Sequence, residues 1–445
     1  MKFLAILIGK VLIIIGKILK KGSSMPGSIA LKLDKNLLKE FSLPDNIIAV
    51  TGSSGKGSTS SIIAEVLRKM GYTVSHNSSG ANLTAGITTM LLENCSLSGR
   101  IKTEYIVYEM DERYAKFVFK DIKPTHIVVT NITRDQPPRQ GDFDLVYEEI
   151  KKALPLGCNL ILNGDDPYLL KFNLNKEYNA IYYSLCKNDY SYFENKFKNL
   201  NMYYCPKCGK KLKYEYYHFE NIGKYNCPKC DFANPNANYT ITNIDYDNFN
   251  FTVDDNYKIN MQYDLLYSIY NAMSAFVTLC ELGLDKNDIC TYINQINGNS
   301  KMYNHYIHNN KQVYILNNKN ENSTTFNQSL LFLERFNGSK TVVIGWKEIS
   351  RRYNFDDLSW LYDIDFEILK KCNVDKIICA GINAYDIATR LKLAGLDNIL
   401  CFNNLTEAFN DTSNANSDYI FAILNFDYVE PFKTIFPKQE ESKWK

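Results

Sequence analysis

The 445-residue sequence lacks the features that mark several classes of protein. Its 51 Lys and Arg against 49 Asp and Glu leave a formal charge of +2, so no basic excess points to nucleic acid as a partner. Its 12 cysteines are too few and too unevenly spaced for a secreted disulfide scaffold, and we expect a reducing, cytoplasmic compartment. No repeat at a fixed period is present. The length and the 45% hydrophobic content predict a folded chain of two or three domains.

Long uninterrupted apolar runs are also missing. The first nineteen residues are mostly apolar, but Lys10 and Lys17 interrupt them, and the remaining runs are shorter than the roughly 20 residues of a spanning helix. No small-residue cleavage site follows. For residues 1–34 we expect an amphipathic helix and an entry segment that pack on the protein body. Contact with the inner face of a membrane is the alternative.

Short apolar runs separated by helix-length sequence predict an α/β fold with two parallel sheets. In residues 35–304, which we expect to form a central domain, these runs are 47–50, 105–108, 126–130 and 159–162. In residues 305–445, which we expect to form a second, doubly wound domain, they are 313–316, 341–345, 376–380, 398–402 and 419–424. Polar, Tyr- and Lys-rich sequence interrupts the first series at about 200–236 and predicts an insertion there.

A glycine-rich loop follows the first of these strands and precedes a helical pattern at about 59–70. It reads Gly52, Ser53, Ser54, Gly55, Lys56, Gly57 and Ser58. Glycines let backbone N–H groups surround phosphate oxygens, Lys56 can neutralise the β- and γ-phosphates, and Ser58 can hold Mg²⁺. The context predicts a nucleoside triphosphate site, with a glycine-rich turn that binds no nucleotide as the alternative.

An acidic residue is expected to share the metal with Ser58. Glu109 ends the strand at 105–108, and Asp111 and Glu112 follow it. Because ligands bind at the carboxyl ends of parallel strands, we assign Glu109 to Mg²⁺, with an exposed acidic turn as the alternative. Residues 130–136 follow another strand and could reach the same crevice.

Two identical Cys-Pro-Lys-Cys quartets lie in the insertion. Eighteen residues separate them, and their cysteines are Cys205, Cys208, Cys227 and Cys230. This spacing is typical of a closed, structural Zn²⁺ site with four thiolates. A redox pair or a nucleic-acid ribbon is the alternative. No Cys–His nucleophile arrangement is apparent, so we do not expect this chain to hydrolyse an amide by itself.

Four segments resemble, in order, the motifs of the Mur ligase superfamily. The loop at 51–59 matches the superfamily's ATP loop, with Ser54 where Asn is usual, and Glu109 matches its metal-binding Glu. Residues 162–167, Leu-Asn-Gly-Asp-Asp-Pro, are similar to its Leu-Asn-x-Asp-Asp-Pro turn. Residues 270–275 are similar to the helix on the adenine side of the nucleotide. The resemblance implies that Asn271 contacts the nucleotide.

Further features resemble the MurT branch of this superfamily. They are the inserted cysteine ribbon, the triplet Arg134-Asp135-Gln136, the stretch at 357–367 that includes Asp-Leu-Ser-Trp-Leu, and the segments at 386–395 and 25–33. The MurT resemblance implies ATP-dependent amidation of the D-glutamate α-carboxylate of the lipid II stem peptide, through an acyl phosphate, in peptidoglycan synthesis. Lys56 and Glu109 would act in catalysis.

The MurT resemblance also implies a partner, a GatD-like glutaminase that supplies ammonia. Asp357 matches the residue that completes the glutaminase's Cys–His pair, with Asp363 and Asp365 as further candidates. An ordinary helix N-cap or a solvated acid is the other reading of Asp357. A stand-alone Mur-type amino acid ligase, or a zinc-ribbon binding protein regulated by nucleotide, is the alternative function.

Several positions depart from the superfamily pattern. Lys301 stands where relatives have a phosphate-contacting Arg, and the two side chains are not equivalent at bidentate sites. Residues 137–140, 321–325 and 344–346 also differ from the usual motifs. The resemblance therefore leaves open an altered substrate or a weakened activity.

Overall fold

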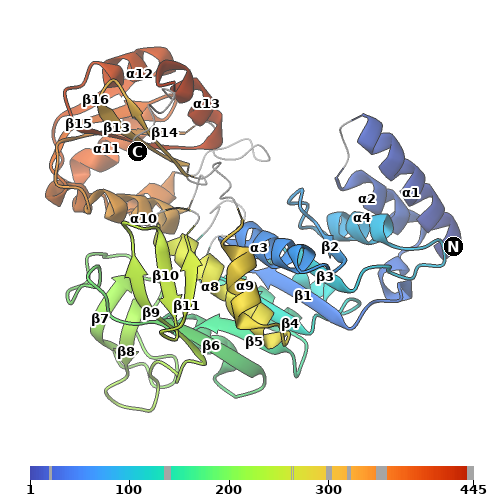
Figure 1. Cartoon of the computed structure of the whole chain (residues 1–445). Coiled ribbons are helices and arrows are strands. Elements are labelled where there is room, and N and C mark those ends of the chain that lie inside the picture. Colours follow the sequence, from blue (N-terminus) through green and yellow to red (C-terminus); the bar gives the residue numbers. More distant parts are fainter. Residues whose placement is uncertain are drawn as a thin grey trace. The chain divides into compact units, whose positions relative to one another are not determined.

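The computed structural model describes residues 1–19, 23–134, 142–261, 263, 265–296, 303–317, 322–346 and 358–437. It divides into two compact units, each with its own sheet (Figure 1). The larger unit comprises Met1–Ile132, Phe143–Glu194 and Asn201–Asn297, and the smaller comprises Thr133–Asp142, Asn195–Leu200 and Gly298–Lys445. The domain limits expected at residues 35 and 305 stay predictions.

The larger unit is built on a nine-stranded sheet in the order β11-β10-β9-β6-β5-β4-β1-β3-β2. Strands β2 to β9 of this sheet pair in parallel, and β9, β10 and β11 pair antiparallel. The strands are β1 (Asn46–Thr51), β2 (Val74–His76), β3 (Tyr105–Glu109), β4 (His126–Val129), β5 (Asn159–Asn163), β6 (Asn179–Leu185), β9 (Tyr239–Asp245), β10 (Asn250–Val253) and β11 (Tyr257–Asn260).

Helices cover both faces of this sheet, which explains the continuous apolar runs in its central strands. Alternate residues of β1 enter different cores: Ile47 and Ala49 on one face, Ile48 and Val50 on the other. Helices α3 and α8 pack on the second face, and α4, α5 and α7 on the first. The helical segments are α1 (Lys2–Ile18), α2 (Met25–Leu33), η1 (Leu37–Glu40), α3 (Lys56–Lys69), α4 (Thr84–Asn94), α5 (Ala115–Val118), α7 (Phe143–Ala153), η2 (Leu169–Asn173), α8 (Leu266–Glu281) and α9 (Lys286–Ile293).

The N-terminal segment forms helix α1, which lies beside α2 and α4 (Figure 1). One side of α1 is buried: Ala5, Ile6, Gly9 and Gly16. Gly9 permits close approach, because a Cβ there would lie 2.7 Å from a methyl carbon of Leu92 in α4. In the described part of the chain, no helix is both long and apolar enough to cross a membrane.

The insertion contains the antiparallel hairpin of β7 (Lys213–Phe219) and β8 (Ile222–Asn226). Aromatic side chains hold it together, since Tyr214 stacks on Tyr217 with ring centroids 4.2 Å apart. Tyr225 and Phe232 join the same core as the first face of the large sheet. The insertion is therefore anchored to the larger unit.

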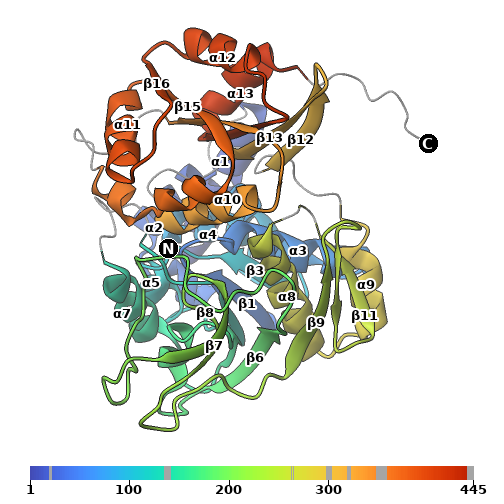
Figure 2. The ribbon, with the colours of Figure 1, turned by 90° about the vertical axis from the view of Figure 1, so that its left-hand side faces the viewer.

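The smaller unit has a six-stranded sheet in the order β12-β13-β17-β14-β15-β16, in which only the edge strand β12 is antiparallel. Helices α12 and α13 cover one face, and α10 and α11 cover the other (Figure 2). The predicted parallel α/β architecture is confirmed. The elements are β12 (Tyr303–His308), β13 (Lys311–Asn317), α10 (Ser323–Leu333), β14 (Lys340–Gly345), η3 (Ser359–Asp363), η4 (Phe366–Lys371), β15 (Val374–Ala380), α11 (Ala384–Leu393), β16 (Ile399–Phe402), α12 (Leu405–Ser413), β17 (Tyr419–Leu424) and α13 (Phe426–Ile435).

Candidate active site and metal centre

The glycine loop joins the carboxyl end of β1 to the first turn of α3. Gly52 (φ +122°) and Gly55 (φ +83°) adopt backbone conformations that other residues rarely take. A Cβ at Gly52 would also lie 2.7 Å from the carbonyl oxygen of Asn131. The two glycines are thus required by backbone geometry, and the loop ends at the N-terminus of a 14-residue helix, where N–H groups favour anions.

The ammonium group of Lys56 lies within the turn of this loop. Nζ donates to the carbonyl oxygens of Gly52 and Ser53, the latter at 3.3 Å, and pairs with Oε1 of Glu112 at 3.4 Å. Both Lys56 and Glu112 are buried. A positive charge is therefore held in the loop, and a carboxylate from the segment after β3 balances it.

The Glu109 carboxylate lies over the first turn of α3. Its Oε2 is 2.8 Å from the position of a Cβ on Gly57, and its Oε1 is 3.6 Å from that of a Cβ on Gly80. Asn77 fixes the backbone of Glu109 by two hydrogen bonds: Nδ2 donates to its carbonyl oxygen, and Oδ1 accepts from its N–H, each at 3.0 Å. The structure therefore brings the predicted metal acid beside the predicted phosphate loop.

Residues after β4 hold the glycine loop in place through hydrogen bonds to its backbone. Oδ1 of Asn131 accepts from the Ser54 N–H, and its Nδ2 donates to the Ser54 carbonyl oxygen, both at 3.0 Å. Thr130 Oγ1 also donates to that carbonyl at 2.6 Å. Thr130 and Asn131 are thus the residues of the segment at 130–136 that contact the glycine loop.

Helix α8 supplies a further side of the site. A Cβ on Gly55 would meet Oδ1 of Asn271, so the glycine lets this amide lie directly against the loop. The hydroxyl of Tyr270, the preceding residue, donates to Oδ2 of Asp165 at 3.4 Å. Ser58 lies in the first turn of α3. The segments expected to contact nucleotide thus converge on the loop.

Asp165 lies in the Leu-Asn-Gly-Asp-Asp-Pro turn after β5 and is fully buried. Burial raises its pKa to about 8, although the Leu185 N–H donates to its Oδ2 at 2.7 Å. Burial likewise raises the pKa of Asp166 to about 7. The turn therefore contains two carboxyl groups whose raised pKa values disfavour ionisation. Asp165 contacts helix α8 through Tyr270.

The four cysteines of the quartets form one cluster. Their sulfur atoms all lie within 4.8 Å of one another, with Cys205 and Cys230 at 3.5 Å and Cys208 and Cys227 at 3.4 Å. Zn–S bonds of about 2.3 Å in a tetrahedron require sulfur separations of about 3.8 Å. The donor set and its spacing therefore fit zinc.

The backbone around the cysteines has the form of two metal-binding knuckles. The Gly209 N–H donates to the Cys205 carbonyl at 2.9 Å, with Gly209 at φ +70°, and the Lys229 N–H points to the sulfur of Cys227 at 3.4 Å. His218 lies outside the cluster and is buried, with Nε2 3.0 Å from the carbonyl oxygen of Leu185.

Arg134 and two candidate aspartates lie in the smaller unit. Arg134 pairs with Asp363 at 2.5 Å and donates to Ser359 Oγ at 3.1 Å. Asp365 is buried, and its carboxylate accepts from the Lys198 N–H at 3.1 Å. Asp357, Lys301, and the departures at 137–140 and at 321 lie outside the described residues.

The described parts of the departing segments have structural roles. Asn322 is buried and caps α10, its Oδ1 accepting from the Thr325 N–H at 2.9 Å. Trp346 packs on Trp360 with ring centroids 5.0 Å apart, and both pack on Phe326. These substitutions therefore fit the core of the unit.

Comparison with known proteins assigns the family. Residues 50–228 match the Mur ligase middle domain, and residues 320–427 match the MurT ligase C-terminal domain. The chain is 32% identical over 380 residues to "Lipid II isoglutaminyl synthase (glutamine-hydrolyzing) subunit MurT" of Staphylococcus aureus (strain COL), covering 85% of this chain and 84% of that protein. This chain belongs to the MurT family. The protein of the same name from Streptococcus pneumoniae (strain ATCC BAA-255 / R6) is 26% identical over 448 residues, covering 95% and 94%.

Solved structures of Mur ligases share the fold of this MurT-family chain. A pseudomurein peptide ligase type C from Methanothermus fervidus aligns with a TM-score of 0.70 at 20% identity, covering 90% of this chain and 80% of that one. MurF from Acinetobacter baumannii aligns with a TM-score of 0.65 at 17% identity, covering 91% and 79%. At these identities the likeness concerns the fold.

Sequence reasoning missed the residues that hold the site together. Asn77 was not singled out, Asn131 was named only as part of a segment, and Glu112 only as a neighbour of Glu109. A common signal was available, because each of the three lies just after the carboxyl end of a parallel strand, β2, β4 or β3.

Proposed function

We propose that this chain is the ATP-consuming ligase subunit of a lipid II isoglutaminyl synthase, which amidates the stem peptide during peptidoglycan synthesis. Membership of the MurT family and the names of the Staphylococcus and Streptococcus relatives support the reaction class. The observation that carries the proposal is the placement of the Glu109 carboxylate over the first turn of α3, beside the loop that holds Lys56.

The proposed reaction has two steps. An oxygen of the D-glutamate α-carboxylate attacks the γ-phosphorus of ATP, and ADP leaves, which gives an acyl phosphate. Ammonia then attacks the carbonyl carbon, a proton is lost, and phosphate leaves, so that a carboxylate has become an amide. Both steps build negative charge on phosphate oxygens, so the site must supply positive charge and N–H donors there.

The described residues suit this demand. The backbone N–H groups of the loop and of the first turn of α3 would bind the phosphates, with the Lys56 ammonium as their counter-charge. The Ser58 hydroxyl and the Glu109 carboxylate are hard oxygen ligands that would hold Mg²⁺, which neutralises charge on the β- and γ-phosphates. Asn271 would contact the nucleotide from α8.

Ammonia would come from a GatD-like glutaminase partner. The Staphylococcus and Streptococcus relatives are named as subunits of a glutamine-hydrolysing synthase, which supports a partner of this kind. We propose Asp357 as the residue that this chain contributes to the partner's Cys–His pair. Asp363 and Asp365 are less suited, because the first is paired with Arg134 and the second is buried.

The cysteine cluster would bind Zn²⁺ with a structural role. Four thiolates complete a tetrahedral site and leave no position for substrate. Metal affinity would then fix the two knuckles beside the β7–β8 hairpin.

The test is reconstitution with purified glutaminase, lipid II, ATP, Mg²⁺ and glutamine, followed by mass analysis of the stem peptide. The expected product has one hydroxyl replaced by an amino group, and it forms only when both proteins and ATP are present. Amide formation without the glutaminase from added amino acid would instead identify a stand-alone ligase. Lack of any ATP-dependent product would refute the proposal.

A further inference from the structure

Helix α1 exposes many large apolar side chains to solvent. Its solvent-facing side shows Phe3 at 59%, Ile14 at 61% and Ile18 at 76% exposure. The exposed positions of this helix are Lys17 and seven apolar residues, called here the apolar face of α1: Phe3, Leu4, Leu7, Val11, Ile14, Ile15 and Ile18. An ordinary surface helix turns mostly polar residues to water, whereas in the described helix α1 seven of the eight exposed positions are apolar.

The lysines of α1 point back toward the body of the larger unit. Lys2 Nζ donates to the Glu40 carbonyl oxygen at 2.6 Å, and Lys10 Nζ donates to the Leu92 carbonyl oxygen at 2.7 Å. Lys17 pairs with Glu93 of α4. The charged ends of these lysines therefore bond to the body, Lys17 while staying exposed, and the apolar face itself presents only hydrocarbon.

Charge is distributed unevenly along the chain in the same region. The first 33 residues contain six lysines and no Asp or Glu, so with a total of +2 the other residues together carry −4. A local excess of this size favours an anionic surface, and apolar area together with basic residues is the combination that binds helices to anionic lipid.

We propose that the apolar face of α1 binds an anionic lipid bilayer, with α1 lying in the plane of the interface. A protein partner is the less suitable occupant. Protein interfaces carry about one hydrogen bond per 100–200 Å² and a polar rim, and this face offers no hydrogen-bonding side chain. Acyl chains require none.

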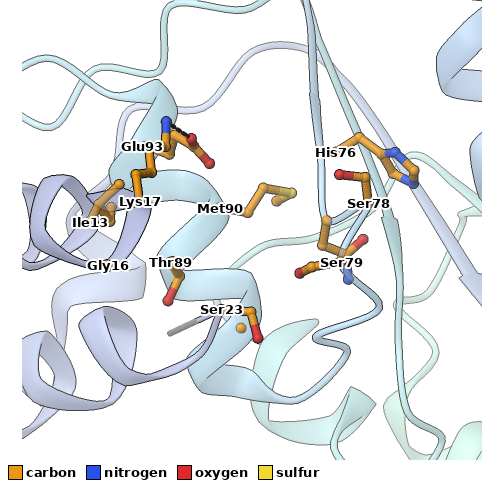
Figure 3. Close-up of a pocket in the computed structure, with 12 residues that line it drawn as sticks. Ile13, Gly16, Lys17, Ser23, His76, Ser78, Ser79, Thr89, Met90 and Glu93 are labelled. Atoms are coloured by element: carbon orange, nitrogen blue, oxygen red, sulfur yellow. Dashed lines mark ion pairs between the residues drawn. The ribbon is translucent and has the colours of Figure 1, made fainter. Parts of the chain in front are cut away.

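The opposite side of α1 lines a cavity of about 440 Å³ (Figure 3). Ile13 and Gly16 of α1 form one wall, Met90 projects from α4, and Ser78 and Asn77 follow β2. Since Asn77 holds the backbone of Glu109, the cavity adjoins the proposed metal acid. A helix is about 10 Å across, so a peptide on a lipid headgroup beside α1 has a short route to the site. This role in delivering substrate rests on the proposed function, whereas binding to the bilayer does not.

The first test is flotation of the full chain with vesicles of phosphatidylglycerol and phosphatidylethanolamine, compared with vesicles of phosphatidylcholine. We expect the wild type to float with the anionic vesicles. The double variant Leu7→Glu, Ile14→Glu should bind them at least tenfold less. Leu156→Glu, which removes an even more exposed apolar residue after α7, should bind like the wild type. Wild-type protein that stays in solution, or a double variant that still floats, would overturn the proposal.

Experiments in solution test whether another protein covers the apolar face of α1 instead. Light scattering that finds a dimer in the wild type and a monomer in the double variant would assign the face to a second copy. Loss of glutaminase binding in the double variant would assign it to that subunit. Either result would overturn the bilayer proposal, and an unchanged mass and unchanged partner affinity would support it.

Activity with two acceptors separates this inference from the proposed function. With a water-soluble stem peptide, wild type and double variant should amidate at equal rates, because neither changed residue lines the cavity. With lipid II in vesicles, only the double variant should slow, by tenfold or more. If the wild type floats but amidates neither acceptor, the proposed function fails and the bilayer contact stands.

Discussion

Replacing Gly57 by Ala should separate catalysis from stability. Gly57 is the second residue of α3 and has a helical backbone, so alanine fits there and raises helix propensity by up to about 1 kcal/mol. Its Cβ, however, would lie 2.8 Å from Oε2 of Glu109, where ordinary contact begins at 3.4 Å. The carboxylate oxygen must therefore move by about 0.6 Å, since the backbone of Glu109 is held by Asn77.

The expected cost follows from that displacement. A misplacement of about 1 Å at a reacting centre can cost about 100-fold in rate, so 0.6 Å should cost about tenfold or more, equivalent to about 1.4 kcal/mol of transition-state stabilisation. The assay is ADP release with glutaminase, glutamine and lipid II, repeated over a range of Mg²⁺ concentrations. We expect turnover to fall at least tenfold and the Mg²⁺ concentration for half-maximal rate to rise, while the melting temperature is equal or higher.

Gly71→Ala, just beyond the other end of α3, is the matched control. Gly71 follows α3 at φ +93°, and no heavy atom lies within 4 Å of the added Cβ. This variant should lose about 1–2 kcal/mol of stability and keep its turnover. If Gly57→Ala is as active as the wild type and needs no more Mg²⁺, the assignment of Glu109 to the metal is refuted.

Three further predictions concern zinc, ammonia and pH. Cys208→Ser should lose the bound zinc that metal analysis of the wild type finds, whereas Cys186→Ser, at an exposed cysteine outside the cluster, should keep it. Asp357→Asn should lose at least tenfold in glutamine-driven amidation and keep the rate with added ammonia, and Asp363→Asn should keep the glutamine-driven rate; equal loss with both nitrogen sources would contradict the role of Asp357. Burial raises the pKa of Asp165 to about 8, so between its ordinary value and about 8 the folded chain keeps a proton that the unfolded chain has released, and the free energy of unfolding falls as the pH rises through that window. Asp165→Asn should flatten this decline, measured as melting temperature between about pH 5 and about pH 9.

Much of the fold could be predicted from the sequence because its signals are local. β1, β3 and β4 are continuous apolar runs since helices cover both sheet faces, and each run stands alone in the sequence as a recognisable strand. The glycine loop is equally local, because strand, glycines and helix follow one another within 24 residues, from Asn46 to Lys69. The cysteine quartets also predicted their cluster, since four sulfur ligands at this spacing favour one arrangement.

The hydrogen bonds that hold the site in place could not be predicted in the same way, because they join residues that are far apart in the sequence. Asn131 binds the backbone of Ser54, which is 77 residues away, and Asn77 binds that of Glu109, 32 residues away. Isolated asparagines after strands are common in loops. No local pattern distinguishes an asparagine that bonds to a distant backbone segment from one that is exposed to solvent. The contact of Asn271 with Gly55 likewise depends on how α8 packs on α3.

Ser54 illustrates how these distant contacts bear on the departures from the superfamily pattern. The superfamily motif that the loop resembles has Asn at this position, where this chain has Ser54. Asn131, however, reaches the N–H and the carbonyl oxygen of residue 54, and Thr130 donates to the same carbonyl. These three hydrogen bonds use backbone atoms, so they survive exchange of the side chain. The path of the loop therefore depends on Gly52, Gly55 and the residues after β4, and serine at position 54 is compatible with a loop that binds nucleotide.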